Sequence, residues 1–321
     1  MRLGKLDNDV LKKLVLDKFP RTRIESYGSP AIGEDCARLD LGGDLTVLST
    51  DPITSAGIGQ LGRLSVHVNC NDAAAAGAEP VGLLITLLLP PDTTEADIAR
   101  IVDDVATACR AAHVDVLGGH TEVTDAVTRP VTNTTVVARC PVSGTLPGMR
   151  PGDDLVLTKY AALEGTLLIL EDRPQYAQDL TEKQKKTVQS IAEMLSVVPE
   201  GLYAARHGAT AMHDITEGGV YGAVWEMAER YGCGVTVFPR SVPFLPETEI
   251  LCQAAGLDPF RLIGSGSMLI ACKHGDALVK GLSDIGISAS VIGKVTERGV
   301  YTDSGEAIEP PAADEFYRLF V

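Results

Sequence analysis

Four aspartates stand where a predicted strand ends or a predicted helix begins. They are Asp35 in "GEDCA", Asp51 in "STDPI", Asp72 in "NCNDAAAAGAEP" and Asp214 in "HDITEGG". Hard cations such as Mg²⁺ take oxygen ligands, and carboxylates from separate loops can converge on one metal bound to a triphosphate. Each aspartate alone would also serve as a helix cap or a turn residue. Together, with small residues beside each, the four predict a magnesium–phosphate site.

Two glycine-containing segments supply further candidate binding groups. In "HDITEGG" the glycines open a predicted helix whose free N–H groups attract an anion, and the candidates are Thr216, Glu217, Gly218 and Gly219. A glycine turn that allows close packing is the alternative there. The second segment, "GGHTE", follows a predicted strand and contains Gly118, Gly119, His120, Thr121 and Glu122. His120 fits a general acid or base and a hydrogen-bonded loop histidine equally well.

Asn69 and Asn71 precede four consecutive alanines within a predicted helix. Asparagine and aspartate can cap a helix, so a capping role is one interpretation of this polar group. A metal or phosphate site on a closely packed helix is the other, because an alanine run favours helix and lets neighbouring backbones approach.

Two common nucleotide-binding loops are disfavoured. The segment "GIGQLG" has dinucleotide-binding spacing, but five residues separate its first glycine, Gly57, from the strand end at Asp51. The chain contains no G-x-x-x-x-G-K-[ST] segment, so a nucleotide site in it is not a P-loop.

Composition restricts the possible partners. The 321 residues are 45% hydrophobic and 22% charged, which is typical of a globular protein with about two domains. A net charge of −15 argues against binding nucleic acid or an anionic membrane. A small phosphorylated ligand remains compatible with this charge, because a divalent cation can bridge carboxylates to phosphate oxygens.

Cysteine spacing and hydropathy predict a cytoplasmic protein. The seven cysteines are scattered without a C-x-x-C pair, which favours reduced thiols over a zinc site or a disulfide framework. The segment "MRLGKLDNDVLKK" lacks the apolar core of a signal peptide. The longest apolar run, residues 81–90, is about half of a membrane span.

Hydrophobic periodicity predicts mixed α/β structure in two halves. A Gly/Pro-rich stretch at residues 144–154 divides the chain into expected domains 1–147 and 148–321. The first half is expected to contain strands at 45–51, 81–90, 114–119 and 130–140 and helices at 61–77 and 93–113. Thr94 and Asp97, at the start of the second helix, resemble a capping box. The second is expected to contain strands at 154–159, 265–272 and 287–295, a helix at 182–195, and another from about 218 to a glycine cap at 232.

The order of these motifs resembles the AIR synthase-like (PurM-like) ATP-binding superfamily. The matching segments run from "GEDCARLD" and "STDPI" through "NCNDAAAAGAEP" and "GGHTE" to "HDITEGGVYGAVWEMAE", and cover most of the chain. The superfamily includes aminoimidazole ribonucleotide synthase, thiamine-monophosphate kinase, selenophosphate synthetase and the hydrogenase-maturation protein HypE. Within it, the chain looks most like the HypE-related proteins.

The resemblance implies a fold and a set of ligands. It implies an N-terminal α/β domain whose sheet pairs with its twin into a barrel across a homodimer, followed by a C-terminal α/β domain. It also implies ATP and Mg²⁺ as cofactors, with Asp72 holding the metal on the triphosphate and Asp35, Asp51 and Asp214 as further metal or phosphate ligands. The alanine-containing helix would then pack at the dimer interface.

Three departures from the family pattern concern the chemistry. Glu34 stands where relatives commonly have aspartate, and His120 stands where many have an acid, with Glu122 displaced from that position. HypE ends in a cysteine that carries a carbamoyl-derived group, whereas no cysteine follows Cys272 here. The thiocyanate-forming reaction of HypE is therefore not expected.

The leading functional hypothesis is Mg–ATP-dependent phosphoryl transfer to an oxygen of a small acceptor. Lys159, in "LTKYAALEGT", is a candidate phosphate-binding or catalytic residue, with a surface lysine at a strand end as the alternative. A kinase of the thiamine-monophosphate type is the second hypothesis. The third is a non-catalytic ATP-binding partner of another maturation factor.

Overall fold

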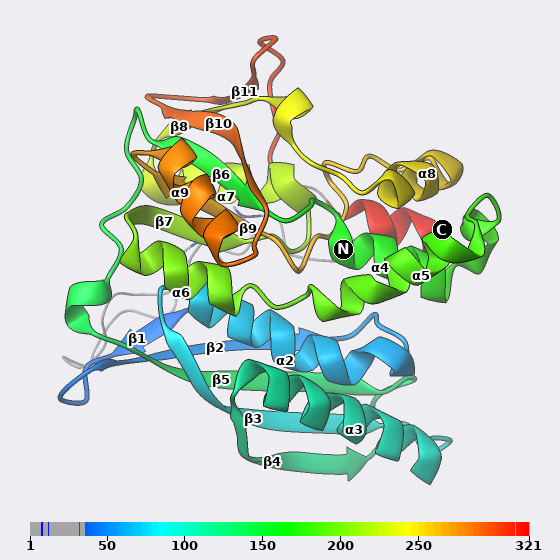
Figure 1. Ribbon diagram of the computed structural model, residues 1–321. Helices are drawn as coiled ribbons and strands as arrows, with labels where there is room; N and C mark the ends of the chain where they lie inside the picture. The colour runs from blue at the N-terminus through cyan, green and yellow to red at the C-terminus, as the bar shows by residue number, and fades with distance from the viewer. Residues whose placement is uncertain (1–7, 9–11, 13–31, 33–35, 312, 321) are drawn as a thin grey trace.

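The structure is a computed structural model that describes residues 8, 12, 32, 36–311 and 313–320. Asp35 and Glu34 lie outside the described residues, so the structure does not test them. The described chain forms two halves, each built on one sheet, that meet along a single long helix, α2 (Figure 1). This is the two-part mixed α/β architecture that the sequence predicts.

The first sheet has five strands in the order β1-β2-β5-β3-β4, of which only β3 and β4 pair in parallel. Its strands are β1 (Ala37–Leu39), β2 (Leu45–Ile53), β3 (Glu79–Leu89), β4 (Asp115–Val123) and β5 (Val131–Cys140). Alternate residues of β5 point to opposite faces, so Val136 and Ala138 are buried while Arg139 is exposed. One face of this sheet is therefore covered and the other is open.

Two helices cover the buried face, α2 (Ile58–Ala75) and α3 (Glu95–Ala112) (Figure 1). The predicted capping box at the start of α3 is confirmed, because Thr94 accepts from the Asp97 amide and the Asp97 side chain accepts from the Thr94 amide. His113 ends this helix with a left-handed φ of 55°.

The second sheet has the order β11-β8-β10-β6-β9-β7. Its strands are β6 (Asp154–Thr158), β7 (Ala209–Asp214), β8 (Gly234–Val237), β9 (Met268–Cys272), β10 (Ala289–Thr296) and β11 (Val300–Thr302). The helices of this half are α4 (Leu163–Asp172), α5 (Glu182–Ser190), α6 (Val198–Arg206), α7 (Gly219–Tyr231), α8 (Pro246–Ala255) and α9 (Gly275–Asp284). Short 3₁₀ turns are η2 (Val142–Gly144), η3 (Pro174–Ala177), η4 (Ile191–Glu193), η5 (Pro239–Ser241) and η6 (Glu315–Phe320). The helix expected at 182–195 is thus α5 followed by η4.

Both faces of the second sheet are covered. Leu157 and Leu269 pack against α7 on one face, and Val156 and Ile270 pack against α6 and α9 on the other. Helix α7 ends at Gly232 in the left-handed conformation, which confirms the predicted glycine cap.

The alanine run joins the two halves of this chain. Ala73 packs in the cluster under the first sheet, whereas Ala74 and Ala75 pack with residues of the second sheet and α6. Added at Gly201 in α6, a Cβ would lie 2.8 Å from the Ala74 carbonyl oxygen, so only small residues allow this approach. The expectation that these alanines form a dimer contact is corrected, because their own chain buries them.

The helices in the described part of the chain all fall short of the combined length and apolar character that a membrane span requires.

Candidate functional site

The end of β2 and the middle of α2 meet at a polar corner, which we define as Ser49, Asp51, Asn69 and Asp72. Asn69 is fully buried and binds the backbone of Asp51 through both ends of its amide. Its Oδ1 accepts from the Asp51 N–H at 2.9 Å, and its Nδ2 donates to the Asp51 carbonyl at 3.4 Å and the Ser65 carbonyl at 3.2 Å. Asn69 therefore fixes the position of Asp51 rather than offering a free amide to a ligand.

Asp72 lies one helical turn beyond Asn69 and is 3% exposed. The Ser49 hydroxyl donates to Asp72 Oδ2 at 2.5 Å, and the Cys36 thiol donates to the Asp72 carbonyl at 3.3 Å. Ser49 and Asp51 are two residues apart in β2, so both face the helix. The structure thus brings Asp51 and Asp72 to one side of the strand. Ser49 was missed by the sequence reasoning, although its polar side chain among buried strand residues was a usable signal.

The corner suits a magnesium ion that arrives with phosphates. Among the described residues, no group of three or more His, Cys, Asp or Glu side chains is placed to hold a metal ion. Mg²⁺ in nucleotide sites commonly uses one or two carboxylates and completes its shell with water and phosphate oxygens. Asp51 and Asp72 supply carboxylates of this kind, so the donor set fits such an ion.

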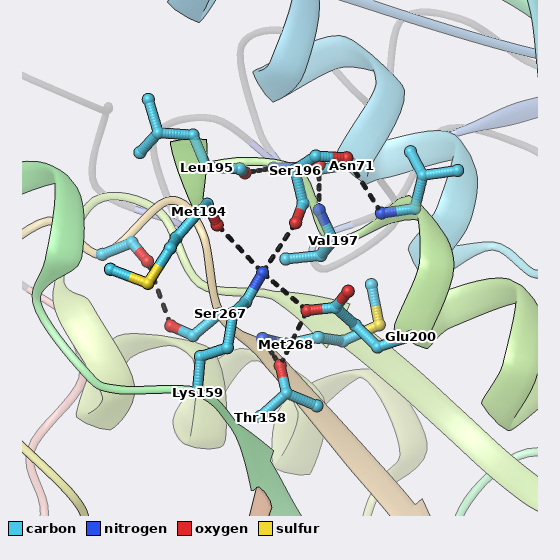
Figure 2. A network of polar contacts seen from close by, with 12 residues as sticks. Asn71, Thr158, Lys159, Met194, Leu195, Ser196, Val197, Glu200, Ser267 and Met268 are labelled. Atoms are coloured by element: carbon cyan, nitrogen blue, oxygen red, sulfur yellow. Dashed lines mark hydrogen bonds and ion pairs between the residues drawn. The ribbon is translucent and has the colours of Figure 1, made fainter. Parts of the chain in front are cut away.

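Asn71 and Lys159 instead meet in a network between the two halves (Figure 2). Asn71, fully buried in α2, donates to the Leu195 carbonyl at 2.9 Å and accepts from the Val197 N–H at 2.8 Å. Lys159 Nζ donates to the carbonyls of Met194 at 2.9 Å and Ser196 at 2.6 Å. The segment 194–197 is therefore held by one side chain from each half of the chain.

The remaining bond of Lys159 is an ion pair with Glu200. Its Nζ lies 2.7 Å from Glu200 Oε1, and the two side chains are 13% and 2% exposed. Thr158 Oγ1 also donates to Glu200 at 3.3 Å (Figure 2). Burial lowers the pKa of Lys159, while the Glu200 carboxylate opposes that shift. All three N–H donors of the ammonium have protein acceptors, so we assign Lys159 a structural role; it is not the surface lysine considered as an alternative.

The "GGHTE" residues lie on β4, an exposed strand at the edge of the first sheet. Across the sheet, Gly119 is aligned with Ile85 of β3, Ile85 with Thr134 of β5, and Thr134 with Asp51 of β2. Gly119 therefore lies three strand spacings, ~14 Å, from Asp51 in the corner. A Cβ at Gly119 would lie 1.9 Å from the Ile85 carbonyl oxygen, which explains the glycine. His120 Nε2 lies 3.4 Å from Glu122 Oε2, and both side chains are exposed.

Gly118 and Thr121 are exposed on the same strand. Within one chain, β4 therefore does not join the corner. The edge position of β4 could not be read from the sequence, because strand order is set by long-range pairing.

The predicted loop at the start of α7 is already bound to the C-terminal segment. Gly218 caps the helix with φ of 86°, and its N–H donates to Asp314 Oδ2 at 2.7 Å. Glu217 Oε1 accepts from the Tyr317 hydroxyl at 2.6 Å. The Asp314 carboxylate therefore accepts the Gly218 N–H hydrogen bond that the sequence analysis expected a phosphate to accept.

The other members of this segment have different surroundings. Thr216 is partly exposed, and a Cβ at Gly219 would lie 2.6 Å from the Phe260 carbonyl oxygen. Asp214 is 1% exposed at the end of β7. Nε2 of the neighbouring His213 lies 3.3 Å from Oε2 of Glu226 in α7, and both side chains are buried. The sequence analysis did not predict this pair, because its two residues come from different elements.

Comparisons with known proteins place this geometry in a family. Residues 33–140 match the N-terminal domain of AIR synthase related proteins, and residues 150–304 match the C-terminal domain. The carbamoyl dehydratase HypE of Cupriavidus necator is 30% identical over 274 residues, which cover 82% of this chain and 74% of that protein.

Solved structures share the fold. HypE of Escherichia coli, a hydrogenase maturation protein, has a TM-score of 0.74 and 25% identity over 88% of this chain and 92% of that chain. HypE in complex with ATP has a TM-score of 0.69 and 23% identity, covering 98% and 97%. A HypE–HypF complex has a TM-score of 0.74 and 20% identity, covering 94% and 99%.

The fold is not restricted to HypE. A structure of ThiL complexed with AMPPCP and TMP has a TM-score of 0.75 and 21% identity, covering 98% of this chain and 99% of that chain. Both family domains are matched in order, and a HypE relative reaches 30% identity over most of the chain. The chain belongs to the AIR synthase related family, with HypE proteins among its relatives.

Proposed function

We propose that this protein is a Mg–ATP-dependent enzyme that transfers a phosphoryl group to an oxygen of a small acceptor. The observation that carries the proposal is the polar corner, where α2 and the end of β2 bring Asp51 and Asp72 to one side of the sheet. The HypE structure in complex with ATP has this fold and supports ATP as the donor.

The residues of the corner have distinct tasks in this proposal. Asp72, held by Ser49, and Asp51, held by Asn69, are the carboxylates that would bind the metal. Bound Mg²⁺ would neutralise charge on the phosphates. The protein contributes mainly by positioning the donor and acceptor, because phosphoryl transfer needs little covalent participation from side chains. Asp214, from the second half, and Asp35 remain proposed ligands.

Two other functions differ from this one in what happens to the phosphate of ATP. A kinase of the thiamine-monophosphate type leaves phosphate on its product, and the fold of ThiL favours it as the second candidate. A non-catalytic ATP-binding partner of a maturation factor would release no ADP, and the HypE–HypF complex gives this candidate its support.

Acceptor-dependent ADP release tests the proposal. Purified protein with Mg–ATP should release ADP faster when the correct acceptor is added from a panel of carbamoyl compounds, thiamine phosphate and aminoimidazole precursors. An Asp72→Asn variant should lose this release, whereas Asp103→Asn, an exposed position on α3, should keep it. ATP binding without ADP release for any acceptor, with or without a partner protein, would favour the scaffold function. Phosphate retained on the acceptor product would favour the kinase.

We also propose that the protein forms a homodimer through the open face of the first sheet. Leu84 is 44% exposed on that face, opposite the fully buried Leu83, and Leu117, which is 57% exposed, lies beside it on the adjoining edge strand, where it covers Gly82 of β3. Contiguous exposed apolar residues of this kind mark protein interfaces. Leu84→Glu should yield a monomer in sedimentation experiments, whereas Val102→Glu on the exposed side of α3 should not. A monomeric wild type at micromolar concentration would contradict this proposal.

A further inference from the structure

A small cavity of about 80 Å³ lies between the two halves of the chain. One wall is residues 52–56, the segment directly after Asp51. The opposite wall comes from α4, the start of α7 and the C-terminal segment, with the polar residues Glu164, Glu217, Asp314 and Tyr317. Three carboxyl groups therefore line a space that is large enough for about two or three water molecules.

Two of these carboxyl groups are deeply buried. Glu164 is 5% exposed and Asp314 is 2% exposed. Burial raises the pKa of each carboxyl group to about 7, and the charge of Glu217 adds to both shifts. Such groups are stabilised by a cation or by N–H donors placed beside them.

Asp314 and Glu164 differ in their hydrogen bonds. Asp314 accepts from the backbone N–H groups of Gly218 at 2.7 Å and Phe316 at 2.8 Å. The Glu164 carboxyl group accepts hydrogen bonds from Ser265, but its Oε2 atom is fully buried and has no hydrogen-bond partner in the described part of the chain. None of the described residues that line the cavity is Lys, Arg or His. Among the described residues, the cavity therefore has one acceptor oxygen without a donor, and carboxyl groups without a cation beside them.

We propose that this cavity binds a small organic cation with several N–H donors, of the amidinium or guanidinium class. A planar amidinium can donate one charge-assisted hydrogen bond to the available oxygen of Glu164 and direct its other N–H groups to the carboxyl groups of Asp314 and Glu217. Its flat faces are weakly hydrated and suit the apolar walls formed by Leu168, Ile263 and Phe316. The volume admits a group of about four non-hydrogen atoms, the size of acetamidinium. This inference concerns binding alone and does not rest on the proposed phosphoryl transfer.

Calorimetric titration of acetamidinium into the full chain, without ATP or Mg²⁺, tests the proposal. At pH 8 and constant ionic strength, saturable binding is expected with a dissociation constant on the order of 1 mM, as suits so small a ligand. Acetamide, its neutral analogue of equal size, should bind at least tenfold more weakly. Affinity should fall at pH 5.5, which is below the pKa of about 7 of Glu164 and Asp314, so that both are mainly protonated. The third carboxyl group that faces the cavity is that of Glu217.

Variants separate this site from adventitious binding. Glu164→Gln keeps the shape of the side chain and should weaken acetamidinium binding at least tenfold. Glu247→Gln, at a buried glutamate on α8 that does not line the cavity, should leave binding unchanged. Asp314→Asn gives the same test if Glu164→Gln does not fold. No saturable heat with the wild type, or equal affinity in the Glu164 variant, would overturn the proposal.

Discussion

Two polar regions lie between the halves of this molecule, and they differ in how completely their charges are compensated. In the network around Lys159, the ammonium has three acceptors, and Asn71 binds the same segment through both ends of its amide (Figure 2). In the cavity around Glu164, three carboxyl groups converge without a cation among the lining residues described. Both regions join residues that are distant in sequence.

The difference separates structural polar groups from groups available to a ligand. A buried polar network stabilises a single arrangement only when every member is satisfied. The network around Lys159 meets that condition and therefore fixes α2 against the second half. The cavity does not meet it, because Glu164 Oε2 has no partner among the described residues, and an added molecule would gain most at that oxygen. Residue type alone does not distinguish these cases, since both regions contain buried glutamates.

Breaking the Lys159 network should have the largest effect. Lys159→Met would leave Glu200 as a buried charge without its partner, and we expect a loss of about 3–5 kcal/mol in the free energy of unfolding. Lys185 forms a pair of similar length with Glu182, 2.9 Å, but on the surface, so Lys185→Met should leave the free energy of unfolding almost unchanged. Urea denaturation of both variants gives the comparison.

The double variant Lys159→Met, Glu200→Gln sharpens this test. It removes the stranded charge, so it should be more stable than Lys159→Met alone. A Lys159→Met variant that unfolds at the same urea concentration as Lys185→Met would show that the network is not structural.

Asn71→Ala should be the next most damaging change. It leaves the Leu195 carbonyl and the Val197 N–H without their side-chain partner, and we expect a loss of about 2 kcal/mol. The exposed Asn133, which donates to Thr50 at 3.3 Å, is the matched control and should lose less than about 0.5 kcal/mol as Asn133→Ala. The folded Asn71 variant should keep its Mg–ATP affinity. Reduced affinity with unchanged stability would instead assign Asn71 to the nucleotide site.

The buried Glu164 carboxyl group of the cavity should make the stability of the protein depend on pH. The pKa of Glu164 is raised from 4.5 to about 7 in the folded protein. Its favourable contribution to the free energy of unfolding is therefore fully present below pH 4.5 and is lost as pH rises through 7. Asp314 and Glu217, the carboxyl groups beside it, remain in the variant. Glu164→Gln should therefore gain stability relative to the wild type as pH rises from 4.5 to 7, by at most about 1.4 kcal/mol per pH unit. A difference that does not change with pH would contradict the account.

Local sequence signals predicted much of the fold. The strand expected at 45–51 is β2, Leu45–Ile53, and the capping box at Thr94 and Asp97 is present. These features depend on residues within a few positions of one another, which is the range over which periodicity and capping act. The packing of the alanines against α6 could not be predicted in this way, because their partner Gly201 lies far from them in the sequence. The sequence therefore suggested a dimer contact where the structure has a contact within the chain.

The site was less predictable for the same reason. Asn71 and Lys159 were expected at a nucleotide, but their partners in segment 194–197 are too distant in sequence to be inferred. Asp314 lies 96 residues from Gly218, whose N–H it occupies. By contrast, Asp51 and Asp72 lie on the same side of β2 because this strand and the helix that follows it pack together, a connection that short-range order can anticipate.

We predict that the polar corner binds Mg–ATP through Asp72. Calorimetric titration of Mg–ATP into the wild type, Asp72→Asn and Asp103→Asn tests it most directly. The Asp72 substitution removes one charge while keeping the shape of the side chain and an oxygen for Ser49. We predict at least a tenfold loss of affinity for Asp72→Asn and no change for Asp103→Asn, with both variants folded. Equal affinity of all three proteins for Mg–ATP would contradict the account.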